Sequence, residues 1–453
     1  MKRYFLLIFA LMAVLSLEGM AQSFVVSLPF SDKVENSIVR ETTYGNTVSY
    51  VETASDPWIV FASTANATVQ KLQIPSNIFM TDLFLHDEYV YFCGYDNANS
   101  HGVWGWFDTI ASKMASNGIT YYNNFNCRSC DVERFNALVV YSRGTSLFAA
   151  LVGSAIDGLG DARACTVSLA GTEGIATGWS YTIGQSPDTA EKLTNICLTD
   201  NYVVASGVSD PSYSAEHYRI HNRYSMWDGQ ADRRYYYACG PVGVIHCWDG
   251  FAMTRIGGDT IATAAICHIA SSSASYGVLL NVYDMQQTLS ALCCIPPVSS
   301  VEYDNVGYLG QYQIKNLCYS TTNQIFSILL TGKFNFFTDN TIVAQLLYPG
   351  ATNIEFFGRN KHTSFFLDHF TNQSRFLVTG RNDINPNEML YFAQPHSFQG
   401  ACSNYYSDFL ISNAFESKSH SFPYYTCNGQ FDCLMKETIP SDETATNSCE
   451  AKQ

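Results

Sequence analysis

Residues 81–108, TDLFLHDEYVYFCGYDNANSHGVWGWFD, contain the pattern that recurs along this chain. Leu83 and Leu85 alternate with polar neighbours, as expected for a half-buried strand, and a polar turn follows them. The next run, at 89–92, is aromatic and β-branched, which favours a second strand. A loop rich in Gly, Asn and Asp then leads to a third strand at 103–107. The segment therefore predicts consecutive antiparallel strands joined by short connections.

Strand-like runs of this kind return at regular intervals. Their centres are 48 residues apart from Tyr91 to Val139. The distance is 48 again from Leu279 to Ser327, and 50 from Ser327 to Leu377. Repeats of about 40–50 residues with four strands each are typical of propeller blades. The spacing therefore predicts an all-β repeat fold, with longer insertions between some repeats.

We predict a β-propeller of six or seven blades over residues 22–395, and the alternative is a multi-domain β-sandwich array. The first interval is shorter, 31 residues from Val60 to Tyr91. One explanation is that an N-terminal segment completes a blade together with the C-terminal strands and so closes the ring. Four segments also resemble one another as partly apolar lead-ins to a strand: 82–85, 195–198, 265–268 and 316–319.

The first 21 residues have the composition of a secretory signal. Lys2 and Arg3 supply positive charge, residues 5–17 are apolar, and residues 19–21 form a small-residue cleavage site. The apolar stretch is shorter than the roughly 20 residues that span a membrane. We therefore expect cleavage after Ala21 and export, with the mature protein secreted or retained in the periplasm or cell envelope and without a membrane span.

Charge and composition limit the classes of partner. The chain carries a formal net charge of −15, from 25 Lys and Arg against 40 Asp and Glu. Such an acidic chain without basic clusters argues against nucleic acid as a partner. Charged residues make up 14% and aromatic residues 14%, which favours a sheet-rich folded protein over a disordered one.

The chain has fifteen cysteines, and the odd number leaves at least one thiol unpaired. Four of them lie inside apolar strand-like runs and are expected to act as small buried hydrophobic residues: Cys93, Cys197, Cys267 and Cys318. The candidate disulfide cysteines are Cys127 and Cys130, Cys239 and Cys247, and Cys402, Cys427, Cys433 and Cys449.

Spacing and position distinguish two of these groups. Cys127 and Cys130 have the spacing of a redox motif, but the residues that follow predict a turn and a strand rather than a helix N-terminus, so a structural bridge or buried thiols are favoured. The last four lie in a polar C-terminal extension, residues 396–453, which we expect to be partly disordered. Four cysteines allow three pairings, and all three remain open.

Residues 206–258 depart most from the strand pattern, because they are rich in Tyr, Trp, His and Arg. Such residues in loops on a rigid sheet scaffold are typical of a binding surface. The candidate binding residues are Tyr213, His217, His221, Tyr224, Trp227, Arg233 and Arg234. The alternative is that the aromatic side chains fill the interfaces between blades.

Motifs for cofactors and metals are weak. Gly158 and Gly160 open a dinucleotide fingerprint that lacks its third glycine, and no metalloprotease helix motif occurs. Two acidic and amide-rich clusters could supply oxygen ligands for calcium, although Asn and Asp are equally favoured in turns. Their residues are Asp96, Asn97 and Asn99, and Asn382, Asp383, Asn385, Asn387 and Glu388. We favour turns, and therefore expect no metal and no cofactor.

The chain resembles exported propeller-like proteins of Bacteroidota-type bacteria. The resemblance rests on the junction of Ala21 and Gln22 after the signal-like segment and on the strand repeats of residues 40–395. It implies export and a propeller fold, and it supplies no catalytic residue.

From these observations we expect an exported, non-enzymatic binding or scaffold protein of the cell envelope that recognises a glycan or a protein through propeller loops. The alternative is a polysaccharide hydrolase or lyase with a carboxylate-containing site in the propeller funnel. Convergence of His217, His221, Arg233 and Arg234 near the ring axis would favour the enzyme.

Overall fold

The structure is a computed structural model. It describes residues 24–42, 46–63, 68–108, 113–121, 130–157, 162–170, 179–183, 189–211, 218–226, 231–238, 245–269, 276–287, 298–305, 309–334, 337–347, 354–360, 362–370, 375–395, 409–412, 415–419 and 434–438. In this part of the chain no helix is long and apolar enough to cross a membrane.

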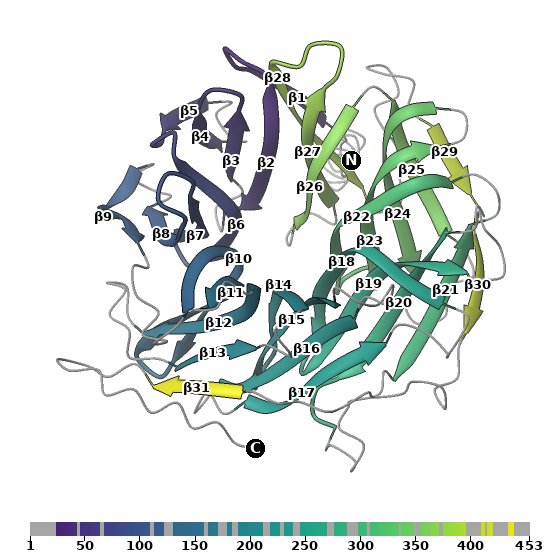
Figure 1. The fold of residues 1–453 in the computed structure, drawn as a ribbon. Coiled ribbons are helices and arrows are strands. Elements are labelled where there is room, and N and C mark those ends of the chain that lie inside the picture. The colour runs from purple at the N-terminus through teal and green to yellow at the C-terminus, as the bar shows by residue number, and fades with distance from the viewer. Residues whose placement is uncertain are drawn as a thin grey trace, which may run out of the picture.

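The described residues form seven antiparallel sheets, which we number as blades 1 to 7 (Figure 1). Blade 1 consists of β2 (Val34–Glu41), β3 (Thr47–Thr53), β4 (Pro57–Ser63) and β5 (Thr68–Gln73). Blade 2 consists of β6 (Ile78–His86), β7 (Tyr89–Asp96), β8 (His101–Asp108) and β9 (Lys113–Tyr121). Blade 3 consists of β10 (Cys130–Arg143), β11 (Ser146–Asp157), β12 (Ala162–Ala170) and β13 (Trp179–Ile183). Blade 4 consists of β14 (Thr189–Leu198), β15 (Tyr202–Pro211), β16 (Tyr218–Ser225) and β17 (Ala231–Ala238).

The remaining blades follow the same order. Blade 5 consists of β18 (Ile245–Gly257), β19 (Thr260–Ile269), β20 (Tyr276–Asp284) and β21 (Ser299–Asn305). Blade 6 consists of β22 (Leu309–Ser320), β23 (Ile325–Phe334), β24 (Phe337–Leu347) and β25 (Ile354–Asn360). Blade 7 consists of β26 (His362–Phe370), β27 (Arg375–Asn382), β28 (Glu388–Pro395) and β1 (Phe24–Pro29).

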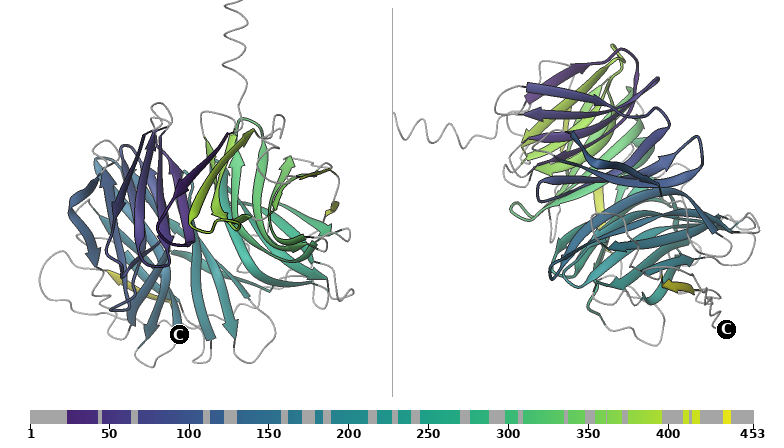
Figure 2. Two further views of the ribbon diagram at one scale, coloured as in Figure 1. Left: turned by 90° about the horizontal axis from the view of Figure 1, so that it is seen from above. Right: turned by 90° about the vertical axis from the view of Figure 1, so that its left-hand side faces the viewer.

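The blades form a ring. The first strand of each blade contacts the first strand of the next, and β26 of blade 7 contacts β2 of blade 1 (Figure 1). Seen from the side, the strands run between two faces, where the turns gather (Figure 2). The prediction of a β-propeller is confirmed, and the described residues form seven sheets in this ring.

The N-terminal strand closes the ring, as the short first interval suggested. β1 pairs antiparallel with β28, from Phe24 opposite Ala393 to Pro29 opposite Glu388. Leu28 packs in the core shared by blades 7 and 1, together with Met389. The last blade therefore needs both ends of the propeller sequence.

Three further strands come from the C-terminal extension and pair with outer strands on the outside of the ring (Figure 1). They are β29 (Phe409–Ser412) beside β25, β30 (Phe415–Ser419) beside β21, and β31 (Leu434–Thr438) beside β13. Added strands cover backbone N–H and C=O groups that would otherwise face solvent at the sheet edge. The other residues of 396–453, including the part expected to be disordered, lie outside the described residues.

The apolar core lies between neighbouring blades. In β10, Ala137 and Val139 pack against blade 4, while Leu138 and Val140 pack against blade 2. Both faces of the sheet are thus buried, which explains why this strand has a continuous apolar sequence instead of a strict alternation. Large side chains such as Trp104 complete these interfaces, and each fully buried apolar side chain contributes about 1.5–3 kcal/mol.

Every first strand contains a register shift, and four blades place a glycine opposite it: Gly94, Gly153, Gly207 and Gly380. A Cβ atom on Gly94 would lie 1.8 Å from the carbonyl oxygen of Phe79. The same atom on Gly153 or Gly207 would lie 1.9 Å from the carbonyl oxygen of Arg134 or Lys192. The bulged backbone therefore passes so close to the second strand that a side chain does not fit.

One predicted equivalence is wrong. Residues 82–85, 195–198 and 316–319 lie in the first strands β6, β14 and β22, but residues 265–268 lie in β19, the second strand of blade 5. First and second strands are both buried apolar runs, so composition alone does not separate them.

Candidate functional site

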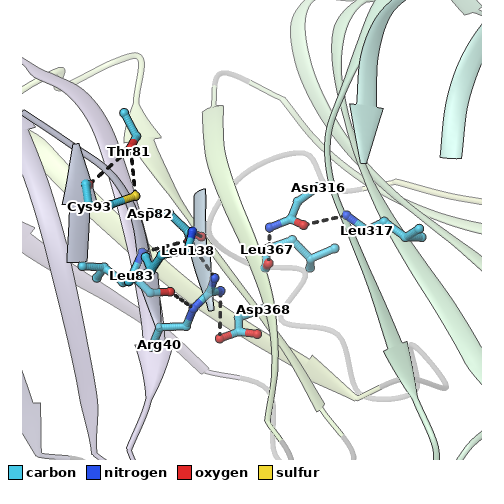
Figure 3. A network of polar contacts seen from close by, with 10 residues as sticks. All are labelled: Arg40, Thr81, Asp82, Leu83, Cys93, Leu138, Asn316, Leu317, Leu367 and Asp368. Atoms are coloured by element: carbon cyan, nitrogen blue, oxygen red, sulfur yellow. Dashed lines mark hydrogen bonds and ion pairs between the residues drawn. The ribbon is translucent and has the colours of Figure 1, made fainter. Parts of the chain in front are cut away.

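Polar side chains of the first strands meet beside the ring axis, and Arg40 of β2 is central to them (Figure 3). Its guanidinium group donates a hydrogen bond of 2.6 Å to the carbonyl oxygen of Leu83 and one of 3.0 Å to Asp82 Oδ1. Its second terminal nitrogen lies 3.5 Å from the carboxylate of Asp368, and its plane lies over the ring of Phe366 at 4.7 Å. Arg40 therefore joins blades 7, 1 and 2.

Both carboxylate oxygens of Asp82 accept hydrogen bonds. Oδ1 accepts from the Leu83 N–H at 2.8 Å as well as from Arg40, and Oδ2 accepts from the Leu138 N–H of blade 3 at 3.1 Å. Burial raises the pKa of Asp82, and nearby Asp368 adds to this rise. Arg40 and the two N–H groups oppose it by stabilising the charged form.

The same kind of bond links other blades. Asn136 donates to the Leu193 carbonyl of blade 4 at 2.7 Å, and Asn316 donates to the Leu367 carbonyl of blade 7 at 2.9 Å. Thr81 donates to the Phe135 carbonyl of blade 3 at 2.7 Å. These side chains lie at or beside the register shifts, so each bulge directs a polar group at the next blade.

The hydrogen bonds of these first-strand side chains decide what chemistry they can perform. A catalytic carboxylate must be able to exchange a proton with a bound substrate. Asp82 instead lies among donors from three neighbours, and Arg40 is engaged by an acid, a carbonyl oxygen and an aromatic ring. The arrangement holds the blades in register, and it contains no acid–base pair aimed at a shared substrate position among the described side chains.

His86 and Ser142 form a second candidate, at the C-terminal ends of β6 and β10. His86 Nε2 lies 3.2 Å from Ser142 Oγ and 3.7 Å from the Asp87 carboxylate. In a catalytic triad the acid binds the other ring nitrogen and orients the imidazole. Here both partners approach the same nitrogen, so the group does not form that relay.

Four of the seven sequence-predicted binding residues lie in described strands, all of them in the third and fourth strands of blade 4. Tyr213, His217 and Trp227 lie outside the described residues. His221 is in β16, and Arg233 and Arg234 are in β17, the third and fourth strands of blade 4, while β14 is the strand nearest the axis. Tyr224 is fully buried in the interface between blades 3 and 4, as the interface-filling alternative requires.

Three cysteines predicted to be buried are confirmed. Cys93, Cys197 and Cys318 are free and buried. Burial raises the pKa of all three, that of Cys197 to about 12, so these thiols are protonated and unreactive at neutral pH.

The candidate disulfide cysteines lie mostly outside the described residues. Cys127, Cys239, Cys402, Cys427, Cys433 and Cys449 lie outside the described residues, and the side chains of Cys130 and Cys247 are not described. Cys130 begins strand β10, as the strand prediction for that segment requires. The backbone register places Cys247 directly opposite Cys267, whose side chain is also not described.

The acidic and amide-rich clusters organise turns. Asp96 accepts hydrogen bonds from Asn77, Asn99 and the Ala98 N–H, and Glu388 accepts from two amides of its own turn. Among the described residues no group of three His, Cys, Asp or Glu side chains could hold a metal ion.

Asp259 is a similar centre that sequence reasoning missed. It lies in the turn between β18 and β19 and accepts hydrogen bonds from Thr199, from the side chain and N–H of Asn201, and from Gln286. Burial acts to raise the pKa of Asp259, but the hydrogen bonds from Asn201, Gln286 and Thr199 outweigh it and hold the pKa below its ordinary value. It therefore fastens blade 5 to the first turn of blade 4.

Replacing Asp259 with asparagine should lower the free energy of unfolding by about 1–3 kcal/mol at pH 7, because one amide N–H₂ would then face other donors. A depressed native pKa means that the carboxylate contributes its stability above about pH 4 and loses it as the pH falls through the native value. In urea unfolding, the difference in free energy of unfolding between the variant and wild type should be smaller at pH 3 than at pH 7. An equal difference at both pH values would contradict this role.

The ring residues Arg40, Asp82 and Asp368 were also missed by sequence reasoning. One usable signal was present: a polar residue followed by Asn or Asp directly before an apolar run, as at 81–82, 194–195 and 315–316. Nothing in the sequence shows that Arg40 and Asp368, 328 positions apart, lie side by side.

No protein-family model matches the chain, and no curated protein matches it. Solved propeller structures are similar in fold. The Dos1 propeller is 8% identical over 80% of this chain and 82% of that chain, with a TM-score of 0.45. The β-propeller domain of the Trilobed protease from Pyrococcus furiosus is 10% identical over 83% and 99%, with a TM-score of 0.45. YCF48 from Cyanidioschyzon merolae is 10% identical over 82% and 99%, with a TM-score of 0.43. The ring of antiparallel sheets itself makes the chain an all-β propeller.

Proposed function

We propose that this protein is an exported, non-enzymatic binding or scaffold protein of the cell envelope, which recognises a glycan or a protein through one face of the propeller. The observation that carries the proposal is the use of the polar groups at the axis. Arg40 and Asp82, together with the amides of Asn136 and Asn316, are bonded from blade to blade. Because these side chains already bond to neighbouring blades, they make a rigid support for a binding surface. They are not free to exchange protons with a substrate, as catalysis would require.

The enzyme alternative required His and Arg side chains to converge with a carboxylate near the axis. Instead, His221, Arg233 and Arg234 belong to the third and fourth strands of blade 4. Strands in those positions lie toward the outside of the ring (Figure 1). This placement supports a binding role over catalysis in the propeller centre.

Export is supported by the position of the closing strand. β1 begins at Phe24, two residues beyond the first residue that cleavage after Ala21 would leave. A cleavage site several residues further along would remove part of the strand that completes blade 7. Cell fractionation with N-terminal sequencing tests this part of the proposal, and the expected product begins at Gln22 in the envelope or the medium.

A binding screen tests the function itself. The mature chain, residues 22–453, is applied to arrays of glycans and of envelope proteins, and each bound glycan is afterwards analysed for cleavage products. We expect at least one ligand to be retained without turnover, and the heat-unfolded protein serves as the control. Cleavage of a bound polysaccharide would overturn the non-enzymatic proposal.

A further inference from the structure

The three strands of the C-terminal extension cover the outer edges of three blades, and we refer to β29, β30 and β31 as the strap. β31 pairs with all of β13 in blade 3, from Trp179 opposite Thr438 to Ile183 opposite Leu434. β30 pairs with β21 of blade 5, and β29 pairs with β25 of blade 6. Blades 3, 5 and 6 therefore have five described strands each, whereas the other blades have four.

The strap does not complete a blade or close the ring. Blades 3, 5 and 6 each have four consecutive strands without it, as blades 1, 2 and 4 do. The ring is closed instead by β1, whose Leu28 packs with Met389 in the core shared by blades 7 and 1. The strap therefore adds edge pairing to a propeller that is already closed.

Two of the three edges under the strap have sequences that favour pairing with another strand. β13, WSYTI, contains no charged residue, Pro or Gly, and the covered part of β25 contains Phe356 and Phe357. Segments of about five to seven residues with high β-propensity and low charge pair readily when their edge is free. The third edge, β21, is acidic, and the backbone register places Lys418 opposite its Glu302.

The outer strands that no described strand covers each have a feature that hinders edge pairing. β5 contains the exposed Lys71, and β17 contains three charged residues in a row, 232–234. In β1, Pro29 has no N–H, and its carbonyl oxygen accepts a hydrogen bond from Lys71. The pairing of β9 with β8 is interrupted between Met114 and Ile119, and such a break bends an edge away from a flat template. The strap thus lies over edges that lack these features in their own sequence.

We propose that the strap is a built-in edge cover, which keeps β13 and β25 from pairing with the same edges of a second copy of this chain. When the strap is displaced, β13 of one copy pairs antiparallel with β13 of the other about a two-fold axis, because a strand edge is complementary to itself in that arrangement. The edge of β25 offers a second contact of the same kind. This role concerns the outside of the ring and is independent of the binding role proposed for its face.

The test uses the triple variant I411P/S417P/M435P of the mature chain, with one proline in each strap strand. Proline has no N–H to donate and disrupts strand pairing, while the sequence of the seven blades stays unchanged. By light scattering from about 1 to 100 µM, we expect a monomeric wild type and a variant that dimerises increasingly with concentration. In dilute solution the backbone amides of β13 and β25 should exchange hydrogen about tenfold faster in the variant than in wild type.

The matched control is I411A/S417A/M435A, which changes the same positions but keeps the backbone N–H groups, and it should remain monomeric. M435P alone uncovers only β13, and it serves as the test if the triple variant does not fold by near-UV circular dichroism. Adding S180K to M435P places a lysine in the uncovered edge of β13. This second change should restore the monomer, because a charged residue on an edge hinders pairing.

Several results would overturn the strap as an edge cover. Unchanged exchange at β13 and β25 in the proline variants would mean that the strap does not protect these edges. Fast exchange in a variant that stays monomeric would mean that the free edges do not associate. Equal dimerisation of the alanine control or of wild type, or dimers of M435P that persist with S180K, would place the contact elsewhere. None of these results bears on the binding screen, so the proposed function is tested separately.

Discussion

Replacing Arg40 with methionine is expected to lower the free energy of unfolding by about 2–4 kcal/mol at pH 8, near the lower end of the cost of breaking a buried ion pair. The side chains of Arg40 and Asp82 are 22% and 15% exposed, so solvent compensates only part of the loss. The variant leaves the Asp82 carboxylate buried without its cation and removes the bond to the Leu83 carbonyl. It should also loosen the seam between blades 7 and 1, where the ring closes.

The loss should be smaller at pH 5 than at pH 8. Burial already raises the native pKa of Asp82, and removal of Arg40 raises it further. A carboxyl group with a raised native pKa is accommodated as the neutral acid at low pH, and stability is lost as the pH rises through that value. Urea unfolding of both proteins at the two pH values measures the difference.

Lys33→Met provides the control for Arg40→Met. The Lys33 and Glu35 side chains are 2.7 Å apart but 47% and 39% exposed, so its loss should cost less than about 1 kcal/mol. If both variants lose the same stability, or if the loss at Arg40 does not depend on pH, the interpretation of Asp82 as a buried and partly compensated charge is wrong.

Replacing Gly94 with alanine should lower the free energy of unfolding by about 1–3 kcal/mol, the usual cost of forcing extra atoms into a packed site. The new Cβ would lie 1.8 Å from the Phe79 carbonyl oxygen and 2.9 Å from the Cα of Met80, and both are backbone atoms that no rotamer change can move aside. The bulge in β6 would have to open. Because that bulge places Thr81 and Asp82 against blade 3, the damage should reach the blade interface.

Gly257→Ala is the matched control for Gly94→Ala. A Cβ at Gly257 meets no atom within 4 Å, so the change should stay within about 0.5 kcal/mol of wild type. Thermal unfolding of the two variants beside wild type provides the measurement. Equal stability of the Gly94 variant and wild type would show that the strands can separate at the bulge without cost.

Local patterns were sufficient for the fold class. Runs such as 89–92 are β-forming by composition, and their spacing of about 48 residues is long enough for four short strands. The closing role of the N-terminal strand could also be predicted from the sequence. The short first interval suggested that an N-terminal segment completes a blade together with the C-terminal strands. The burial of Cys93, Cys197 and Cys318 followed from their apolar neighbours.

Local patterns were insufficient where a residue's role depends on a partner far along the chain. The aromatic composition of residues 206–258 suggested a surface, yet Tyr224 is fully buried, because both faces of a blade pack against neighbouring blades. The C-terminal strands β29 to β31 were also not foreseen. These strands pair with the unpaired backbone edge of an outer strand in another blade. Which outer strands present such an edge is known only once the ring has formed.

The sequence by itself determined that this chain is an all-β repeat protein with apolar strands and a signal-like N-terminus. Hydrophobic alternation, turn residues and repeat spacing are local properties, so they can be read in order along the chain. Only the tertiary structure decided that Arg40 of blade 1 meets Asp82 of blade 2 and Asp368 of blade 7. Charges act through space, and closing the ring sets which of them are neighbours.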